Sequence, residues 1–294
     1  MGECSGLASG RWLLVVALVV ALWGCAGFAS STLAPNAEAM SRHGYVPVVM
    51  PPGIQGWVKR PADTQDRTPS PVLHVYLEGD GAPWWAQRLP PADPTPLTSV
   101  AWPLAVADPH AQVAYLARPC QFLSVHARQS CPVAWWTSAR WSEPVVTLTG
   151  QALDALLQAS GARELVITGH SGGGTLALLV AARRQDVRCV LTVASPLDLQ
   201  AWTEFHGVAA PEESLNPADV SVSSTQIATR HLFGSEDRRV PLASVGRYGE
   251  RLQPDHVIVV PGQGHVQGWV NWWRASGEVQ SRLFSWMKGC LKSG

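Results

Sequence analysis

The feature that most constrains the fold of this chain is a glycine-rich turn at residues 169–173 (GHSGG). It directly follows an apolar, β-branched run at residues 165–168 (LVIT), and an Ala- and Leu-rich helical pattern follows it at residues 175–184. A strand that turns into a helix within so few residues brings the two backbones close together, so the flanking positions must lack side-chain bulk. The motif therefore predicts a strand, a sharp turn and a helix, with the hydroxyl group of Ser171 lifted above the edge of a sheet.

Apolar strand runs alternate with helical patterns on both sides of this turn. The predicted strands are residues 72–77, 113–117, 165–168, 190–194, 228–233 and 257–260, and the predicted helices are residues 144–159, 175–184 and 270–292. The strand runs are continuously apolar, which is typical of strands that are buried on both faces. Residues 45–60, which prolines and a glycine interrupt, predict an opening hairpin. The chain is thus expected to be an α/β protein, with a mostly parallel central sheet and helices on both faces.

The composition argues against a nucleic-acid partner. Lys and Arg together number 22, as do Asp and Glu, so the formal net charge is zero, whereas a nucleic-acid-binding surface is usually basic. The 14 tryptophans are unusually many, and several stand in pairs. Core packing is the usual role of Trp; the alternative, lining of a cleft, makes Trp84, Trp85 and Trp136 candidate substrate-binding residues.

The N-terminal segment predicts export. The uncharged apolar run at residues 12–23 is shorter than the ~20 apolar residues that span a bilayer, and it follows Arg11, as in a secretory signal. Residues 22–25 (LWGC) resemble a bacterial lipoprotein signal, in which Cys25 is lipidated and becomes the new N-terminus. On this interpretation residues 1–24 are a signal peptide, residues 25–45 a flexible tether and residues 46–294 the folded domain, lipid-anchored on the periplasmic side of a bacterial cell envelope. An uncleaved membrane anchor and a plain signal peptide cut near Ala29 are the alternatives.

Export would place the remaining cysteines in an oxidising compartment. Cys120 and Cys131 are close in the sequence, and we expect them to form a disulfide. A second bridge, between Cys189 and Cys290, would tie a central strand to the last helix; the alternative is that Cys189 is a buried free thiol. No Cys or His spacing resembles a zinc site, and neither a metal nor an organic cofactor is implied.

Ser171, at the centre of the glycine-rich turn, is a candidate nucleophile. A serine hydroxyl group attacks only when a base takes its proton, and the base needs a third group to orient it. Because the start of the following helix leaves N–H groups unpaired, the N–H of Gly172 is placed to bind a developing oxyanion. A dinucleotide-binding site is excluded, since the glycines do not match G-x-G-x-x-G.

His265 and Asp237 are the predicted partners of the serine. His265 follows the last predicted strand, and Asp237 follows the strand before it. The loops that follow parallel strands meet at the carboxyl edge of a sheet, and the order Ser, acid, His is the one expected of a G-x-S-x-G enzyme. Asp198, one strand earlier, is the alternative acid, although we expect it to cap a turn or a helix.

The second oxyanion donor is expected in the loop after the first central strand, residues 78–81 (EGDG). The N–H of Asp80 or of Gly81 is the candidate, because the glycines permit unusual backbone angles there. A carboxylate beside an oxyanion hole would be unfavourable, so the side chain of Asp80 is expected to turn outward.

From residue 72 to residue 292 the chain resembles the α/β-hydrolase superfamily of serine hydrolases. The resemblance rests on the G-x-S-x-G turn, on Gly-x-x-Asp-x-x-Val-Pro at residues 234–241 and on Gly-x-Gly-His at residues 262–265. The segments LEGDG, ARPC and WWTSxR also resemble those of a group of exported bacterial lipoproteins. The resemblance implies an α/β-hydrolase fold and cleavage of an ester, thioester or amide through an acyl-enzyme on Ser171, with His265 as base and Asp237 orienting it.

A carboxylic ester is the first choice of substrate, as a small-molecule or lipid-like acyl compound. A peptidase, an acyltransferase with the same triad and a non-catalytic binding lipoprotein on the same fold are the alternatives.

Two further segments are expected to shape the site. Residues 116–141 contain Arg118 and Arg140, which could anchor a carboxylate or phosphate group of the substrate or could pair with Glu143 or Asp80. Residues 199–222, with helix-breaking glycine and prolines, are expected to form a small lid.

Overall fold

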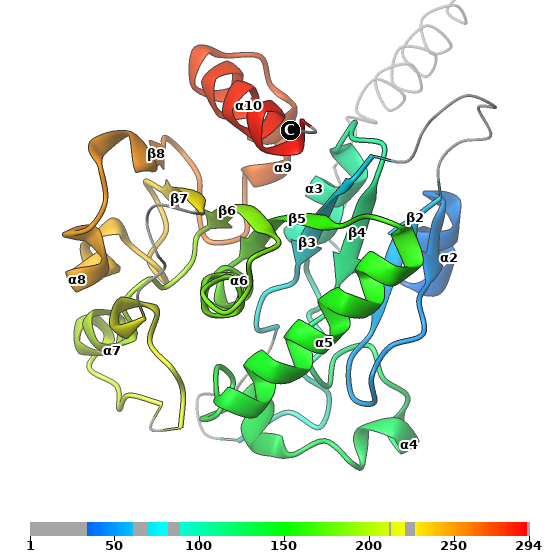
Figure 1. Ribbon diagram of the computed structural model, residues 1–294. Coiled ribbons are helices and arrows are strands. Elements are labelled where there is room, and N and C mark those ends of the chain that lie inside the picture. Colours follow the sequence, from blue (N-terminus) through cyan, green and yellow to red (C-terminus); the bar gives the residue numbers. More distant parts are fainter. Residues whose placement is uncertain (1–33, 61–69, 82–88, 212, 221–226, 293–294) are drawn as a thin grey trace, which may run out of the picture. The chain divides into compact units, whose positions relative to one another are not determined.

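The computed structural model describes residues 34–60, 70–81, 89–211, 213–220 and 227–292 (Figure 1). The strands are β1 (Tyr45–Pro47), β2 (Gly56–Lys59), β3 (Val72–Leu77), β4 (Val113–Leu116), β5 (Glu164–His170), β6 (Val187–Val193), β7 (Ala228–Gly234) and β8 (Val257–Val260). The α-helices are α2 (Ala37–Arg42), α3 (Ala101–Ala107), α4 (Val125–Arg128), α5 (Glu143–Ser160), α6 (Gly172–Ala181), α7 (Leu199–His206), α8 (Gly246–Gly249), α9 (Trp269–Arg274) and α10 (Glu278–Leu291). Short 3-10 turns are η1 (Val133–Trp136), η2 (Pro217–Asp219), η3 (Leu242–Val245) and η4 (Pro254–His256).

The eight strands form one sheet in the order β1-β2-β4-β3-β5-β6-β7-β8. The first three in this order pair antiparallel, and the strands from β4 to β8 pair parallel. The hairpin expected over residues 45–60 is confirmed, with Tyr45 opposite Lys59. The predicted α/β class is therefore confirmed, and all six predicted strands are present, because continuous apolar runs belong to strands that both faces of a sheet bury.

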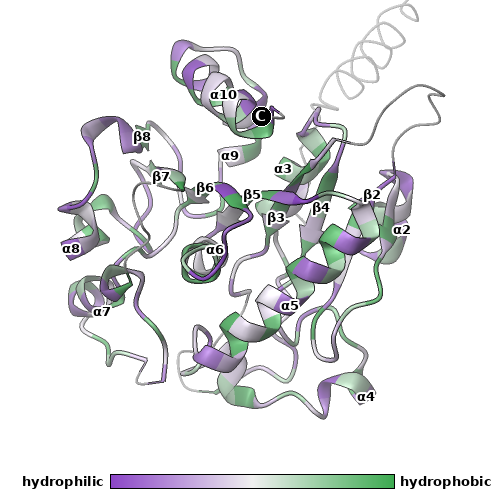
Figure 2. Cartoon of the chain, in the orientation of Figure 1, coloured by the Kyte–Doolittle hydropathy of each residue, from purple (hydrophilic) through white to green (hydrophobic). Residues whose placement is uncertain are grey.

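Two hydrophobic layers cover the two faces of the sheet. Val75 and Leu77 of β3 pack into one cluster with residues of α5, α6, α7 and α8. Tyr76, which points the other way, belongs to a second cluster with residues of α2, α3, α9 and α10. Figure 1 shows α5 and α6 on one side of the sheet and α3, α9 and α10 on the other, and Figure 2 shows apolar positions along the strands and on one side of α5. Alternate residues of a strand point to opposite faces, which is why one strand serves both layers.

Two predicted boundaries are wrong. The helix expected over residues 270–292 is two helices, α9 and α10, separated by Ala275, Ser276 and Gly277. Gly costs more backbone entropy in a helix than other residues, so the pattern breaks there. The expected tether over residues 25–45 also extends too far, because α2 lies within it and its Met40 is buried in the second cluster. The predicted signal peptide and Cys25 lie outside the described residues.

Two disulfides tie the domain together. Cys120 pairs with Cys131, and Cys189 in β6 pairs with Cys290 in α10, 101 residues later. The expected bridge between Cys120 and Cys131 is confirmed, and of the two alternatives left open for Cys189 the structure has the bridge to Cys290. Within the described ranges, no helix combines the length and the apolar character that crossing a membrane requires.

Candidate active site

Ser171 lies in a strained turn between β5 and α6. Its backbone angles are φ 52° and ψ −130°, a left-handed conformation that residues with a side chain rarely adopt. A Cβ atom at Gly169 would meet the backbone of Gly173 and Gly174 at less than 3.0 Å, and one at Gly173 would meet the carbonyl oxygen of Glu78 equally closely. These positions are glycine because β5, α6 and the end of β3 approach one another here.

A chain of hydrogen bonds joins Ser171, His265 and Asp237. His265 Nε2 lies 3.0 Å from Ser171 Oγ, and His265 Nδ1 lies 2.9 Å from Asp237 Oδ2. His265 is in the loop after β8 and Asp237 in the loop after β7, so all three side chains come from the carboxyl edge of the parallel strands. The three residues that the sequence singled out are thus in contact, in the predicted order.

The carboxylate of Asp237 is held from both sides. Its Oδ1 accepts hydrogen bonds from the N–H groups of Arg239 and Val240, at 2.8 and 2.9 Å, and its Oδ2 faces His265. Burial alone raises the pKa of Asp237, but the hydrogen bond and charge of His265 and the two N–H groups outweigh it, so the pKa lies below the ordinary Asp value. The side chain is an ionised acceptor for Nδ1–H at neutral pH.

The alternative acid, Asp198, has a different place. It is the N-cap of α7, where it accepts a hydrogen bond from the N–H of Gln200, and it binds Asn216 and Arg247. The expectation that Asp198 caps a helix is confirmed, because a short acceptor side chain satisfies an orphan N–H at a helix start.

Glu78, the first residue after β3, anchors the loop that follows this strand. This fully buried carboxylate accepts hydrogen bonds from Ser99, from Tyr115 and from the N–H of Gly79. Burial raises the pKa of Glu78, and the three hydrogen bonds oppose that rise without cancelling it. The loop is thereby held against α6, where the N–H groups of Gly172 and Asp80 have no hydrogen-bond partner among the described residues.

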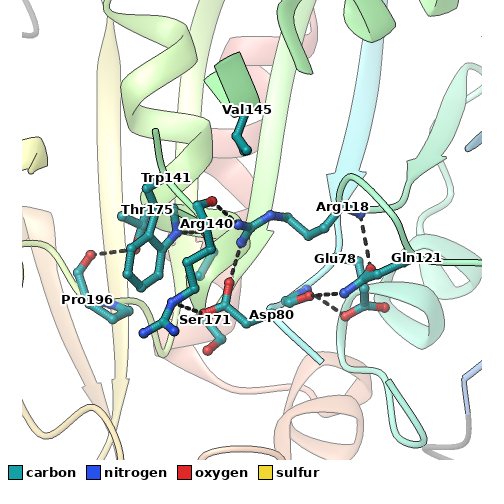
Figure 3. A network of polar contacts seen from close by, with 12 residues as sticks. Glu78, Asp80, Arg118, Gln121, Arg140, Trp141, Val145, Ser171, Thr175 and Pro196 are labelled. Carbon is teal, nitrogen blue, oxygen red and sulfur yellow. Dashed lines mark hydrogen bonds and ion pairs between the residues drawn. The ribbon is translucent and has the colours of Figure 1, made fainter. Parts of the chain in front are cut away.

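The side chain of Asp80 does not turn outward, contrary to expectation. Its Oδ1 pairs with Arg118 Nη1, and its Oδ2 lies 3.3 Å from Arg140 Nε (Figure 3). Arg118 also donates to the carbonyl oxygen of Arg140. The carboxylate lies so close to Gly172 that a Cβ atom there would be within 3.0 Å of Oδ1. Two cations compensate the charge that made an inward orientation unfavourable in the prediction.

A pocket of about 180 Å³ opens at Ser171 and His265. Arg140, a predicted substrate-binding residue, lines it, and so does Trp141, whose Nε1 donates to the carbonyl oxygen of Gly172 at 2.9 Å. Trp136 does not, since it is buried against the Cys120–Cys131 bridge. Its predicted role in substrate binding is therefore wrong, because packing on the disulfide takes the indole away from the pocket. Trp84 and Trp85 lie outside the described residues.

Sequence reasoning missed several pocket residues, His170, Trp202 and Arg239 among them. His170 is the variable position of the G-x-S-x-G motif, and its Nε2 donates to the carbonyl oxygen of His265 at 2.9 Å. Burial lowers the pKa of His170 to about 3, and the neighbouring His265 and Arg239 add to that effect. The ring is neutral at physiological pH and holds the backbone of the histidine loop.

The segment expected to be a lid contributes to this pocket through α7. Trp202 of α7 lines the pocket, and its Nε1 donates to the carbonyl oxygen of Arg239 at 2.7 Å. Movement of this segment stays a prediction. Among the described residues, no three His, Cys, Asp or Glu side chains are grouped in a way that could hold a metal ion.

Neither a family model nor a curated protein matches this sequence. Solved structures do match. Est1E from Butyrivibrio proteoclasticus has a TM-score of 0.54 at 11% identity and covers 84% of this chain and 99% of its own. A membrane phospholipase A, described as a bacterial virulence factor, has a TM-score of 0.52 at 16% identity and covers 96% of this chain and 99% of its own. A puromycin-hydrolyzing peptidase of Mycobacterium tuberculosis has a TM-score of 0.51 at 15% identity and covers 88% of this chain but 41% of its own.

At these identities the similarity is one of fold. It agrees with the parallel sheet from β4 to β8 and with the strand–serine–helix turn at Ser171. The protein has the α/β-hydrolase fold.

Proposed function

We propose that this protein is a serine hydrolase that cleaves carboxylic esters through an acyl-enzyme on Ser171. The observation that carries the proposal is the continuous hydrogen-bonded chain from Asp237 through His265 to Ser171, at the mouth of a pocket. Activation of a serine requires a base within hydrogen-bond reach and an acceptor that orients the base, and both distances meet this requirement.

In the first half of the proposed reaction, Ser171 Oγ attacks the ester carbonyl carbon while its proton passes to His265 Nε2. The carbonyl oxygen becomes an oxyanion, and the N–H groups of Gly172 and Asp80 are the candidate donors to it. The intermediate collapses, the bond to the leaving alcohol breaks, and the alcohol takes the proton from Nε2. Asp237 accepts the hydrogen bond of Nδ1–H throughout and stabilises the imidazolium.

In the second half, a water molecule attacks the acyl-enzyme and gives a proton to His265. The second tetrahedral intermediate expels Ser171, which regains a proton, and the carboxylic acid leaves. An acyltransferase would differ only in the nucleophile that replaces water, and a peptidase in the leaving amine. A non-catalytic binding protein is less well supported, because nothing in simple ligand binding requires these three side chains to be linked in this order.

Labelling with a fluorophosphonate probe tests the proposal. We expect the full chain, in mild detergent, to label covalently, Ser171→Ala to abolish labelling, and His265→Ala and Asp237→Asn to slow it by about 10³-fold or more. Asp198→Asn is the matched control: it alters a neighbouring acid that caps α7 and should label at the wild-type rate. A folded wild-type chain that does not label would contradict the proposal.

We also propose that the protein is exported and lipidated at Cys25. Two disulfides support an oxidising compartment, since such bridges are rare in the reducing cytosol. Metabolic labelling with a palmitate analogue should mark the wild-type chain but not Cys25→Ser; equal labelling of both would rule this site out.

A further inference from the structure

Two arginines, Arg140 and Arg239, line the same pocket as Ser171 and His265. Arg140 precedes α5 and contacts Asp80 in the loop after β3, whereas Arg239 follows Asp237 in the loop after β7. The contacts of each guanidinium group show which of its N–H donors could bind a ligand in the pocket.

Arg140 is buried, and most of its guanidinium group is already engaged. Its Nε faces Asp80 at 3.3 Å, its Nη1 donates to the carbonyl oxygen of Thr137 at 3.1 Å, and its Cζ lies 4.3 Å from the centre of the Trp141 ring. Its Nη2 has no hydrogen-bond partner among the described residues, and it is not among the fully buried unsatisfied atoms. Because Arg140 lines the pocket, this N–H group, which no described residue occupies, can donate to a ligand there.

Arg239 is exposed, and its side chain has neither an ion pair nor a hydrogen bond within the described ranges. Its backbone is fixed: the N–H binds Asp237 Oδ1, and the carbonyl oxygen accepts from Trp202 and His206, at 2.7 and 2.8 Å. The guanidinium group is close enough for its charge to help lower the pKa of His170, which lines the same pocket. The fixed backbone keeps this cation, which has no partner among the described residues, at the pocket.

The carboxylates that line the pocket are engaged with groups other than Arg239. Asp80 is paired with Arg118 and Arg140, so that trio carries a net charge of +1. Glu78 accepts hydrogen bonds from Ser99, from Tyr115 and from the N–H of Gly79. Among the described residues that line the pocket, the Arg239 guanidinium group is thus a cation without a carboxylate partner.

We infer that the substrate carries an anionic oxygen group, a carboxylate or a phosphate, which Arg140 Nη2 and the Arg239 guanidinium group bind beside the reacting ester. Arginine donors suit both groups, because their paired N–H bonds match the spacing of the oxygens. This inference deepens the proposed function and rests on it. It distinguishes the protein from esterases that act on wholly neutral acyl chains.

Equilibrium binding tests the inference without requiring catalysis. Three ligands are titrated calorimetrically into the full-length Ser171→Ala variant. They are monomethyl glutarate, its neutral amide isostere (the same methyl ester with a carboxamide in place of the carboxylate), and methyl 3-(phosphonooxy)propanoate. We expect at least one anionic ester to bind tenfold or more tightly than the amide, with a preference that weakens at high salt. The two anionic ligands show whether carboxylate or phosphate is preferred. Equal affinity for all three would overturn the inference.

Neighbouring arginines provide the matched pair of variants. In the Ser171→Ala background, Arg239→Gln should remove most of the preference for the anionic ligand. Arg238→Gln makes the same charge change at an exposed residue that does not line the pocket and should leave the preference intact. A loss that is equal in both variants would indicate only a general effect of net charge and would overturn the assignment.

Hydrolysis by the wild-type chain separates this inference from the proposed function. If both the glutarate monoester and its amide isostere are hydrolysed at equal kcat/KM, the serine hydrolase stands and the anion site fails. If neither is hydrolysed and no fluorophosphonate label is taken up, but the anionic ligand still binds selectively, the anion site stands and ester hydrolysis fails. We expect a kcat/KM ratio of at least tenfold in favour of the anionic ester.

Discussion

Gly172 is needed for more than backbone freedom, because the carboxylate of Asp80 occupies the space in which a side chain would begin. Arg118 and Arg140 hold that carboxylate in place, so it cannot swing aside without leaving two largely buried cations unpaired. The same glycine carries one of the N–H groups proposed to bind the oxyanion. One residue thus links the packing of the turn to its proposed chemistry.

At the residue scale, we therefore predict that Gly172→Ala slows fluorophosphonate labelling by about 10²-fold or more. A methyl group at less than 3.0 Å from Asp80 Oδ1 must displace either the loop or the helix start, and loss of one oxyanion donor alone costs 10²–10³-fold. Gly150→Ala is the control. Gly150 lies in α5, and a Cβ atom there would have its nearest neighbour, Arg184 Nη1, at 4.0 Å. It should label normally and gain roughly 0.5–1 kcal/mol in stability. Normal labelling of Gly172→Ala would show that the contact relaxes easily.

At the scale of elements, the sequence predicted strands better than helix ends. The strands β3 and β8 have the predicted bounds, because turns bound their continuous apolar runs on both sides. The helix pattern of residues 270–292 continued through a break, since amphipathic spacing survives a short interruption that leaves both helices on the same face of the sheet. The short helices α3 and α4 were not predicted, because so few residues carry too little periodicity.

The element that depends most on a covalent link is α10, which Cys290 joins to β6 through Cys189. We predict that Cys189→Ala/Cys290→Ala lowers the free energy of unfolding by about 2–5 kcal/mol, measured by urea denaturation. The control, Cys120→Ala/Cys131→Ala, opens a loop of only 11 residues rather than 101. In the chain-entropy model it should cost ~2 kcal/mol less. A larger loss of stability on removal of the Cys120–Cys131 bridge would show that chain entropy does not determine which disulfide stabilises the protein more.

At the scale of the whole molecule, the buried polar groups make folding sensitive to acid. Burial lowers the pKa of His231 to about 3, as it does for His170. Burial alone would raise the pKa of Asp108, but the charge and hydrogen bonds of its partners, His74 first, lower it to about 2. In each case the unfolded chain takes up a proton at a higher pH than the native protein does, near 6.5 for His and 3.9 for Asp. Stability therefore falls as the pH drops through these windows.

For His231 this gives a measurable slope. Between pH 6 and pH 4 the unfolded state gains a proton that the native state does not, so this residue removes ~1.4 kcal/mol of stability per pH unit. We predict that urea denaturation of His231→Gln shows a pH slope shallower by about that amount, even if the variant is less stable at pH 7 because it loses the 2.9 Å contact with Thr192. Identical slopes would show that His231 protonates in the folded protein.

The sequence by itself determined the class of fold, the strand–turn–helix around Ser171, and Asp237 and His265 as the candidate partners of the serine. These are local signals: continuous apolar runs mark buried strands, and the loops after parallel strands meet at one edge. Only the tertiary structure decided the charges around the pocket. Arg118, 38 residues from Asp80, together with Arg140, turns an unfavourable carboxylate into a neutralised one, and packing on a disulfide takes Trp136 away. The sequence left the pairing of these arginines with Asp80 open as one alternative, because such pairings depend on long-range packing, which leaves no periodic or local trace in the sequence.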